Sequence, residues 1–374
     1  MHSGKYILII LFVVIISLPA LNSLMGVWEF ERKDENRAFK NSVNLSIENI
    51  DAIPAEAEAY LNDNFSFRSP LLDLYHYIKF HIAKVSPHRE KTVIGRDNWY
   101  FMAGKDKEIY EGNHNFSFAE LEAMESEWQH RKHYFDSLDI AYYWLICPIK
   151  YHIYPEKLPF TVSHRNEIKL VDQLKTHLAK KFPKLIIDPT EKLREAKAHE
   201  KLFYQLDNHW NYRAGLIASE KLLSTIKADF PNAPIGDITP FEWKDTVLHS
   251  GHHHRVLGIE SLSEQEKWPL LNNQVSVNAE KYGFPVIKGF PYKWQYERRF
   301  VNKRDTTGLR LLVIRDSFGK QLMPFIKEAF SETVYIFDSW QYGVNKEIIE
   351  TVKPDIIVYM SVEAYIDHFL TEYE

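Results

Sequence analysis

The stretch LRLLVIRDSFG, residues 309–319, decides the fold. Its apolar run from Leu309 to Ile314 predicts a buried β-strand, and residues Phe318–Phe330 repeat at helical spacing. A strand that passes directly into a helix is typical of an α/β sheet. Ser317 stands between the two, where the carboxyl end of such a strand faces the ligand crevice.

The same alternation of strand and helix extends to both sides of this stretch. Further strands are predicted at Ala141–Ile146, Leu185–Ile187, Thr333–Phe337 and Ile356–Met360, and helices at Arg165–Phe182, Leu216–Ile226 and Val344–Val352. Strands that read as solid apolar runs are buried on both faces, as in a parallel sheet covered by helices. The sequence therefore predicts a three-layer α/β domain.

The N-terminal segment is apolar and long. Residues Tyr6–Trp28 carry no charge and suffice to cross a bilayer, so residues 1–28 are predicted to be a membrane anchor or signal segment. An uncleaved anchor is favoured over a cleaved signal peptide, because small residues at a clean cleavage site are lacking around Ala20–Ser23. Lys5 before the span predicts that everything after the span lies outside the cytoplasm.

After this segment we expect a polar linker over residues 29–50 and a single domain over residues 51–374. A helix is predicted at Pro54–Asn62, and Ser117 begins another, with Glu120 at capping-box spacing. Residues at about 229–307 mix Pro, Gly, His and Trp without a clear period, which predicts an irregular inserted region.

Composition excludes some classes of function. A net charge of −5 provides no basic field for nucleic acid, so we expect no nucleic-acid partner. The single cysteine, Cys147, cannot form an intramolecular disulfide, and its apolar surroundings predict a buried, inert thiol.

Ser317 permits two interpretations. A hydroxyl at a strand end, close to the positive end of a helix, suits a nucleophile. Asp316 and Ser317 are also common helix-capping residues, and capping alone would explain either.

A possible base for this serine lies about a hundred residues earlier. Asp207 and His209 stand two positions apart, so both side chains can point the same way from an extended segment. An imidazole can take the proton of a serine, and a carboxylate can fix the tautomer of that imidazole. A surface pair in a loop is the alternative. Trp210, next to His209, is either a packing anchor or one wall of the site.

These residues resemble the alginate O-acetyltransferase family of AlgX and AlgJ, with its SGNH-hydrolase-like domain. In that family an Asp-x-His-Trp block precedes a Gly-Asp-Ser-Phe block. Similar positions extend over most of Asp51–Ile366: Asn62, Asp63, Phe65, Phe67, Arg68, Gly95, Trp99, Phe101, Pro148, Lys150, Tyr154, Pro155, Leu158, Pro159, Pro354, Asp355 and Glu363.

The resemblance implies a flavodoxin-like parallel sheet and a triad in which Ser317 is the nucleophile, His209 the general acid-base and Asp207 the orienting carboxylate. Trp210, Arg315 and Lys150 are candidate substrate-binding residues. Arg315 departs from the family, which has Gly there, so the geometry of the oxyanion hole is open. A structural salt bridge of Arg315 is the alternative to anion binding.

The run from Gly251 to Arg255 contains three adjacent His residues. Adjacent side chains point in different directions and rarely chelate one ion, so we expect a polar loop and no metal or other cofactor. Residues His249–His254 as the lining of a saccharide cleft are the alternative.

The resemblance implies transfer of acetyl to a hydroxyl of an extracytoplasmic polysaccharide, with acetyl supplied through a multi-pass membrane O-acyltransferase. The expected location is the inner membrane, single-pass, with the catalytic domain in the periplasm or outside the cell. Two alternatives stay open: a carbohydrate acetylesterase with the same residues, and a non-catalytic polysaccharide-binding scaffold.

Overall fold

The computed structural model describes residues 3–30, 39–82, 85–164, 169–258, 262–271, 274–304 and 308–371. The chain divides into two compact units, Met1–Pro87 and His88–Glu374. The second unit begins later than residue 51, where the sequence places the start of the domain. The division into residues 1–28, 29–50 and 51–374 stays a prediction.

The N-terminal unit is helical. Helix α1, Ser3–Met25, contains a stretch from Lys5 to Met25 whose length and apolar composition suffice to cross a bilayer, two properties that a signal sequence shares. The predicted helix at Pro54–Asn62 is confirmed as α2, Ile53–Asn64. It follows the 3₁₀ helix η1, Ile47–Ala52, and precedes α3, Arg68–Tyr77, and η2, Ile78–Ile82. Residues 31–38 of the predicted linker lie outside the described residues.

The second unit is built on a seven-stranded sheet of order β4-β3-β11-β9-β10-β8-β7. The first five strands of this order are parallel, and β8 and β7 add antiparallel pairs at one edge. The predicted α/β class is therefore confirmed, with a mostly parallel sheet. The strands are β3 Ala141–Cys147, β4 Ile186–Ile187, β7 Ser276–Asn278, β8 Glu297–Asn302, β9 Arg310–Arg315, β10 Glu332–Phe337 and β11 Ile356–Val362.

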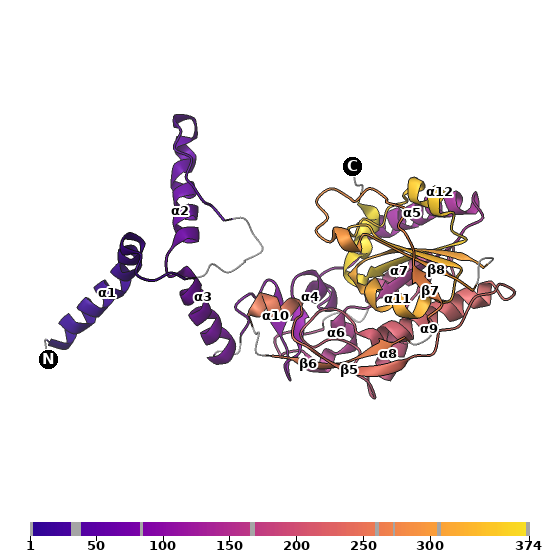
Figure 1. The fold of residues 1–374 in the computed structure, drawn as a ribbon, viewed down its shortest axis with the longest axis horizontal. Helices are drawn as coiled ribbons and strands as arrows, with labels where there is room; N and C mark the ends of the chain where they lie inside the picture. Colours follow the sequence, from indigo (N-terminus) through magenta and orange to yellow (C-terminus); the bar gives the residue numbers. More distant parts are fainter. Residues whose placement is uncertain are drawn as a thin grey trace. The chain divides into compact units, whose positions relative to one another are not determined.

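Helices cover both faces of this sheet (Figure 1). Right-handed crossovers between parallel strands place the connecting helices α7 and α12 on one face of the sheet and α11 on the other. Helix α5 contacts α7 on the first face, and α9 contacts α11 on the second. The predicted capping box of Ser117 and Glu120 begins α5. The bounds are α5 Phe118–Asp136, α7 Leu170–Leu178, α9 Tyr212–Asp229, α11 Met323–Ile326 and α12 Lys346–Val352.

Smaller elements surround the carboxyl end of the sheet. The hairpin of β1 and β2 and the helices α4, α6, α8 and α10 belong to this set, together with η3 and η6. Their bounds are β1 Thr92–Ile94, β2 Tyr100–Met102, α4 Lys105–Tyr110, α6 Lys150–Ile153, η3 Pro155–Lys157, α8 Thr190–Ala196, α10 His252–Leu257 and η6 Glu363–Leu370.

Two predictions about elements are wrong. The helix expected at Phe318–Phe330 is a 3₁₀ turn, η5 Ser317–Gln321, followed by the short α11, because Pro324 in the first turn of α11 starts a new helix. The region at about 229–307 is not irregular throughout. It contains the pair β5 Glu242–Leu248 and β6 Glu264–Leu270, the 3₁₀ turn η4 Lys293–Gln295, and strands β7 and β8 of the main sheet.

The strand order indicates that a ligand site lies at the carboxyl end of the parallel strands. The chain leaves β3 toward β4 in one direction and leaves β9 toward β10 in the other, so their carboxyl ends flank a point where the connections diverge. Ligand crevices of open α/β sheets form at such points. Ser317 follows β9, and Lys150 follows β3.

Candidate active site

Asp316 and Ser317 have separate tasks at the end of β9. The carboxylate of Asp316 accepts hydrogen bonds from the N–H groups of Phe318 at 2.8 Å and Val362 at 2.6 Å, and from the hydroxyl of Tyr342 at 3.1 Å. Burial raises the pKa of Asp316 against the effect of these donors. Asp316 is thus the cap of the turn, and the half-buried Ser317 keeps its hydroxyl for another partner.

That partner is the imidazole of His209. The distance from His209 Nε2 to Ser317 Oγ is 2.7 Å, and the distance from His209 Nδ1 to Asp207 Oδ1 is 2.5 Å. In this arrangement the Nδ1–H donates to the carboxylate, and Nε2 accepts from the serine hydroxyl. The structure therefore brings Asp207, His209 and Ser317 together as a hydrogen-bonded chain.

The carboxylate of Asp207 is held by backbone donors as well. It accepts from the N–H of His209 at 3.0 Å and of His252 at 2.7 Å. Burial alone would raise the pKa of Asp207, but His209 and these two N–H groups hold it well below its ordinary value. A carboxylate held in its charged form beside the ring is able to stabilise a protonated imidazole.

His252, the first of the three adjacent His residues, supplies the second of these N–H groups, and the three residues do not form the expected polar loop. They begin helix α10, in which His253 and His254 are buried. Gly251 precedes the helix, and a Cβ atom there would lie 2.4 Å from the carbonyl oxygen of Leu206. Glycine thus lets α10 approach the segment that carries Asp207.

Lys150 holds the carbonyl groups of that segment. Its Nζ donates to the carbonyl oxygens of Tyr100 at 2.6 Å, Tyr204 at 2.7 Å, Asp207 at 3.1 Å and Gln205 at 3.2 Å. Burial lowers the pKa of Lys150 to about 7. The ammonium group fastens the segment before His209 to strand β2.

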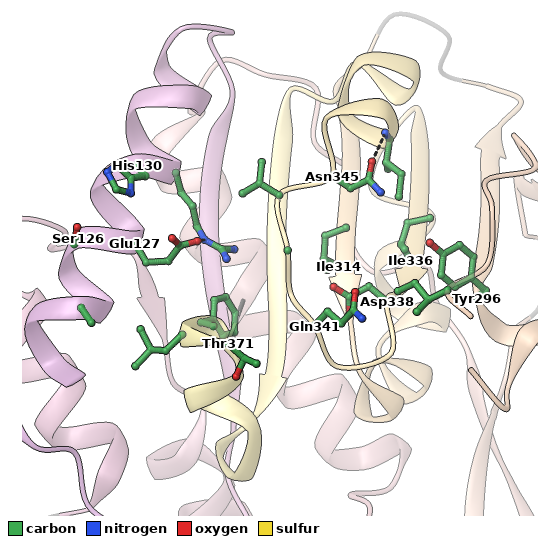
Figure 2. Close-up of a pocket in the computed structure, with 18 residues that line it drawn as sticks. Ser126, Glu127, His130, Tyr296, Ile314, Ile336, Asp338, Gln341, Asn345 and Thr371 are labelled. Carbon is green, nitrogen blue, oxygen red and sulfur yellow. Dashed lines mark hydrogen bonds and ion pairs between the residues drawn. The ribbon is translucent and has the colours of Figure 1, made fainter. Parts of the chain in front are cut away.

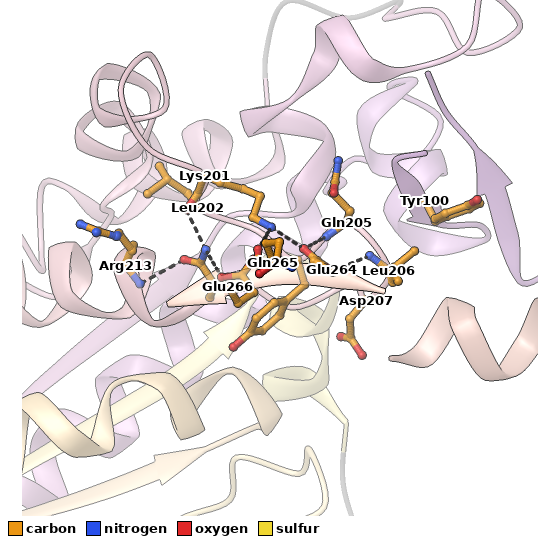
Figure 3. Close-up of polar contacts among 12 residues, drawn as sticks. Tyr100, Lys201, Leu202, Gln205, Leu206, Asp207, Arg213, Glu264, Gln265 and Glu266 are labelled. Carbon is orange, nitrogen blue, oxygen red and sulfur yellow. Dashed lines mark hydrogen bonds and ion pairs between the residues drawn. The ribbon is translucent and has the colours of Figure 1, made fainter. Parts of the chain in front are cut away.

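Glu264 holds the N–H groups of the same segment (Figure 3). Its buried carboxylate accepts from the N–H of Gln205 at 2.5 Å and of Leu206 at 3.1 Å, and from the Nζ of Lys201 at 2.9 Å. Glu264 comes from β6, in the region that was predicted to be irregular. The segment is therefore held on both its carbonyl side and its N–H side by buried charges.

The structure does not support direct substrate contact for Trp210, Arg315 or Lys150, whose exposed fractions are 0%, 1% and 2%. Trp210 Nε1 donates to the carbonyl oxygen of Phe318 at 2.9 Å, and so supports the turn of Ser317. Arg315 donates to the carbonyl oxygens of Asp316 at 2.9 Å and Gln295 at 3.1 Å. These side chains are already engaged within the protein.

Arg315 is compatible with the serine turn. It is the last residue of β9, where extended backbone suits any side chain, so no glycine is needed. Space is made instead at Gly319, where a Cβ atom would lie 2.3 Å from Arg315 Cδ.

Two further carboxyl groups lie near the site. Burial and the neighbouring Glu363 raise the pKa of Asp106 to about 7, and His209 acts on Asp106 in the opposite direction. Glu363 is buried, and its Oε1 lies 3.3 Å from Nε2 of His152.

Burial raises the pKa of the Cys147 thiol, as expected for an inert cysteine.

A metal ion has one group of possible ligands among the described residues, and it is separate from the site. The ligand atoms of Glu122, Glu125 and His177 lie within 4.8 Å of one another. Glu125 also pairs with Lys181.

The sequence indicates the three hydrogen-bonded residues and singles out Lys150, but it does not reveal that Glu264 and His252 hold the same segment. His252 acts through its backbone, which no side-chain motif reveals. Glu264 and Glu266 alternate with exposed residues in β6, a period-2 pattern that indicates a strand face but not its partner.

Comparisons with known proteins agree with this fold. The family model for the SGNH hydrolase-like domain of acetyltransferase AlgX matches residues 92–281. No curated protein matches the chain. Bacillus cereus PatB1 with a sulfonyl adduct is 15% identical with a TM-score of 0.51, and the match covers 75% of this chain and 98% of that one.

Two further solved structures are similar. The O-acetyltransferase domain of Pseudomonas putida AlgJ is 14% identical with a TM-score of 0.46, over 76% of this chain and 94% of that chain. Pseudomonas aeruginosa AlgX is 13% identical with a TM-score of 0.47, over 75% of this chain and 64% of that chain. Because the family model covers more than half of the 374 residues, the chain belongs to the AlgX family of SGNH hydrolase-like acetyltransferases.

Proposed function

We propose that the chain transfers an acetyl group to a hydroxyl of an extracytoplasmic polysaccharide through an acyl-Ser317 intermediate. The observation that carries the proposal is the continuous chain from Ser317 Oγ through the ring of His209 to Asp207. Ser317 lies beyond the residues that the family model matches, so its role rests on this geometry.

In the first half of the reaction, Ser317 Oγ attacks the acetyl carbonyl carbon and its proton passes to His209 Nε2. The bond to the donor's leaving group breaks, and the leaving group takes that proton. Asp207 stabilises the imidazolium between these transfers. Backbone N–H groups of the serine turn are proposed to stabilise the oxyanion.

In the second half, a glycan hydroxyl attacks the acetyl carbon of acyl-Ser317. His209 takes the hydroxyl proton and returns it to Ser317 Oγ as the ester bond to the serine breaks. The same steps with water in place of the glycan would release acetate.

The location and partners are part of the proposal. Helix α1 is proposed to be a single inner-membrane span that keeps the catalytic domain on the periplasmic or external side. The acetyl group is proposed to arrive through a multi-pass membrane O-acyltransferase, and the acceptor is proposed to be an exopolysaccharide of the kind that gives the alginate family its name.

The test is incubation of the purified full chain with a small acetyl ester and a glycan acceptor. We expect the mass of the glycan to rise by one acetyl group per transfer, at a rate that exceeds acetate release. Ser317→Ala should abolish both products, and Ser224→Ala, an exposed serine on α9, should abolish neither.

The other outcomes decide against the proposal. Acetate release without glycan mass gain would identify an esterase. Full glycan acetylation by Ser317→Ala would leave only a binding or scaffolding role for this site.

A further inference from the structure

A cavity of about 700 Å³ lies apart from Ser317, His209 and Asp207, none of which lines it. Its walls come from α5, the start of α12, the loop at 338–345 and the face of β9 and β10 (Figure 2). Ser126, Glu127 and His130 stand on α5 at one side, and Asp338, Gln341 and Asn345 at the other. Its volume is within the range of about 300–1,000 Å³ that is usual for small-molecule sites.

Two buried charged side chains line this cavity, and each has a polar atom without a hydrogen-bond partner among the described residues. Arg131 is 3% exposed, donates through Nε to Glu127 at 2.7 Å, and has an Nη1 without a hydrogen-bond partner among the described residues. Asp338 is 8% exposed, and its Oδ1 has no hydrogen-bond partner among the residues that the structure describes. Both atoms are closed off from solvent, and the Arg131 guanidinium also packs over the rings of Trp128, Tyr359 and Phe369, so these side chains make the wall of the cavity polar without being contact points themselves.

The loop that carries Asp338 is strained. Ser339, Trp340 and Tyr342 have φ values of 59°, 63° and 52°, which favour glycine. Strain of this kind collects at ligand sites and switch regions. The fold thus maintains a costly loop conformation beside the cavity.

The lining sets the chemistry of the occupant. It offers the hydroxyl of Ser126 and the amides of Gln341 and Asn345, beside the apolar side chains of Ile314, Ile336 and Phe369. Glu127 and Arg131 are paired with each other at 2.7 Å, and burial raises the pKa of Asp338 to about 7, so the cavity favours neither a strongly anionic nor a cationic ligand. A neutral sugar has hydroxyls that both donate and accept, and C–H faces that pack on apolar groups.

We infer that this cavity is a second saccharide-binding site, separate from the serine, that takes a neutral sugar unit. That the sugar belongs to the acceptor polymer rests on the proposed function, whereas the binding itself does not. The loop at 338–345 also contacts the serine turn, because the hydroxyl of Tyr342 donates to Asp316 at 3.1 Å. The site is therefore joined to the candidate active site by one hydrogen bond.

The test is saturation-transfer NMR on the full chain in a zwitterionic detergent that carries no sugar. The probes are cellotetraose, chitotetraose and the acidic tetramannuronate. Ser126→Trp and Gln341→Trp fill the cavity from opposite walls, and Gln129→Trp places the same ring on an exposed position of α5 that does not line it. Thermal melts check that each variant is folded.

We expect at least one neutral tetrasaccharide to receive saturation, and the signal to fall at least threefold in both cavity-filling variants. Gln129→Trp and Ser317→Ala should keep the wild-type signal. Equal signals in all variants, loss of the signal in Ser317→Ala, a preference for tetramannuronate, or no signal from either neutral probe would overturn the inference. Because no outcome requires acetyl transfer, its failure is distinct from failure of the proposed function.

Discussion

At the level of single residues, the site divides work between neighbours. Asp316 caps the turn with its carboxylate, so the hydroxyl of Ser317 is left for His209. Capping and nucleophilic attack, the two interpretations of this dipeptide, are therefore compatible. Trp210 and Arg315 then support the turn through carbonyl oxygens on either side of Ser317.

Asp207→Asn tests the carboxylate. An amide at this position favours the wrong tautomer of His209 and cannot stabilise its cation, so kcat should fall by about 10³–10⁴-fold in an acetyl-ester assay. A fall of less than tenfold would show that Asp207 does not orient the ring.

The same variant has a signature in the pH dependence of stability. The folded pKa of Asp207 is depressed, so its contribution is present above the unfolded value of about 3.9 and is lost as the pH falls below it. Denaturant melts should show a shallower loss of stability below about pH 4 in Asp207→Asn than in the wild type. Parallel curves would contradict the assignment.

Lys150→Met tests a positioning residue. Removing the ammonium group leaves buried carbonyl oxygens unpaired, so the free energy of unfolding should drop by roughly 2–4 kcal/mol. Because Lys150 holds the segment before His209, kcat should fall while KM for a small acetyl ester stays within twofold.

Lys157→Met is the matched control, because Lys157 pairs with an exposed Asp97 at 2.6 Å. It should change stability by no more than about 0.5 kcal/mol. A rise in KM for Lys150→Met without a change in kcat would instead favour direct substrate contact.

At the level of elements, the sequence predicts the central strands well. β3, β9, β10 and β11 are buried on both faces, so their apolar runs mark them within a residue or two. β7 escapes prediction because it is an edge strand of three residues, and β8 because its residues are mostly polar. The apolar spacing after Ser317 is satisfied by a turn and a short helix, so periodicity alone overestimated the helix.

For the candidate site, too, the sequence predicts only the residues that stand in local patterns. Asp207, His209 and Ser317 stand in local patterns that chemistry makes recognisable. Glu264 and the N–H of His252 reach the site only through pairing of distant segments. No local pattern records such contacts.

Gly251→Ala tests how α10 supports the site. The new Cβ atom would lie 2.4 Å from the carbonyl oxygen of Leu206, which is backbone and cannot rotate away. Either α10 or the Asp207 segment must shift, so acetyl-ester turnover should fall at least tenfold in a folded protein.

The control is Gly258→Ala at the other end of the same helix. Its Cβ atom meets nothing within 4 Å, but its φ of +63° makes the change strained. We expect a loss of about 1 kcal/mol in stability and nearly unchanged turnover. Equal activity losses in both variants would show that the helix matters only for stability.

For the whole molecule, the prediction concerns the apolar segment of α1. If it is an uncleaved anchor, the protein isolated from cell membranes should have the mass of the full chain. It should also stay in the membrane fraction after washes with about 1 M salt or alkaline carbonate, which remove peripheral proteins. Deletion of residues 1–28 should release it. A mass that corresponds to a mature protein starting near residue 24 would identify a cleaved signal peptide.

The position of β11 has a consequence for how the protein becomes active during synthesis. β11 lies between β3 and β9 and pairs with both, yet it is the last strand in sequence among the described residues. A nascent polypeptide that has already emerged past Ser317 still lacks the partner that aligns those two strands. Acetyl-ester turnover should therefore appear only after β11 has inserted between β3 and β9. A premature stop before Ile356 should leave Asp207, His209 and Ser317 present in the chain but without the sheet that brings them together.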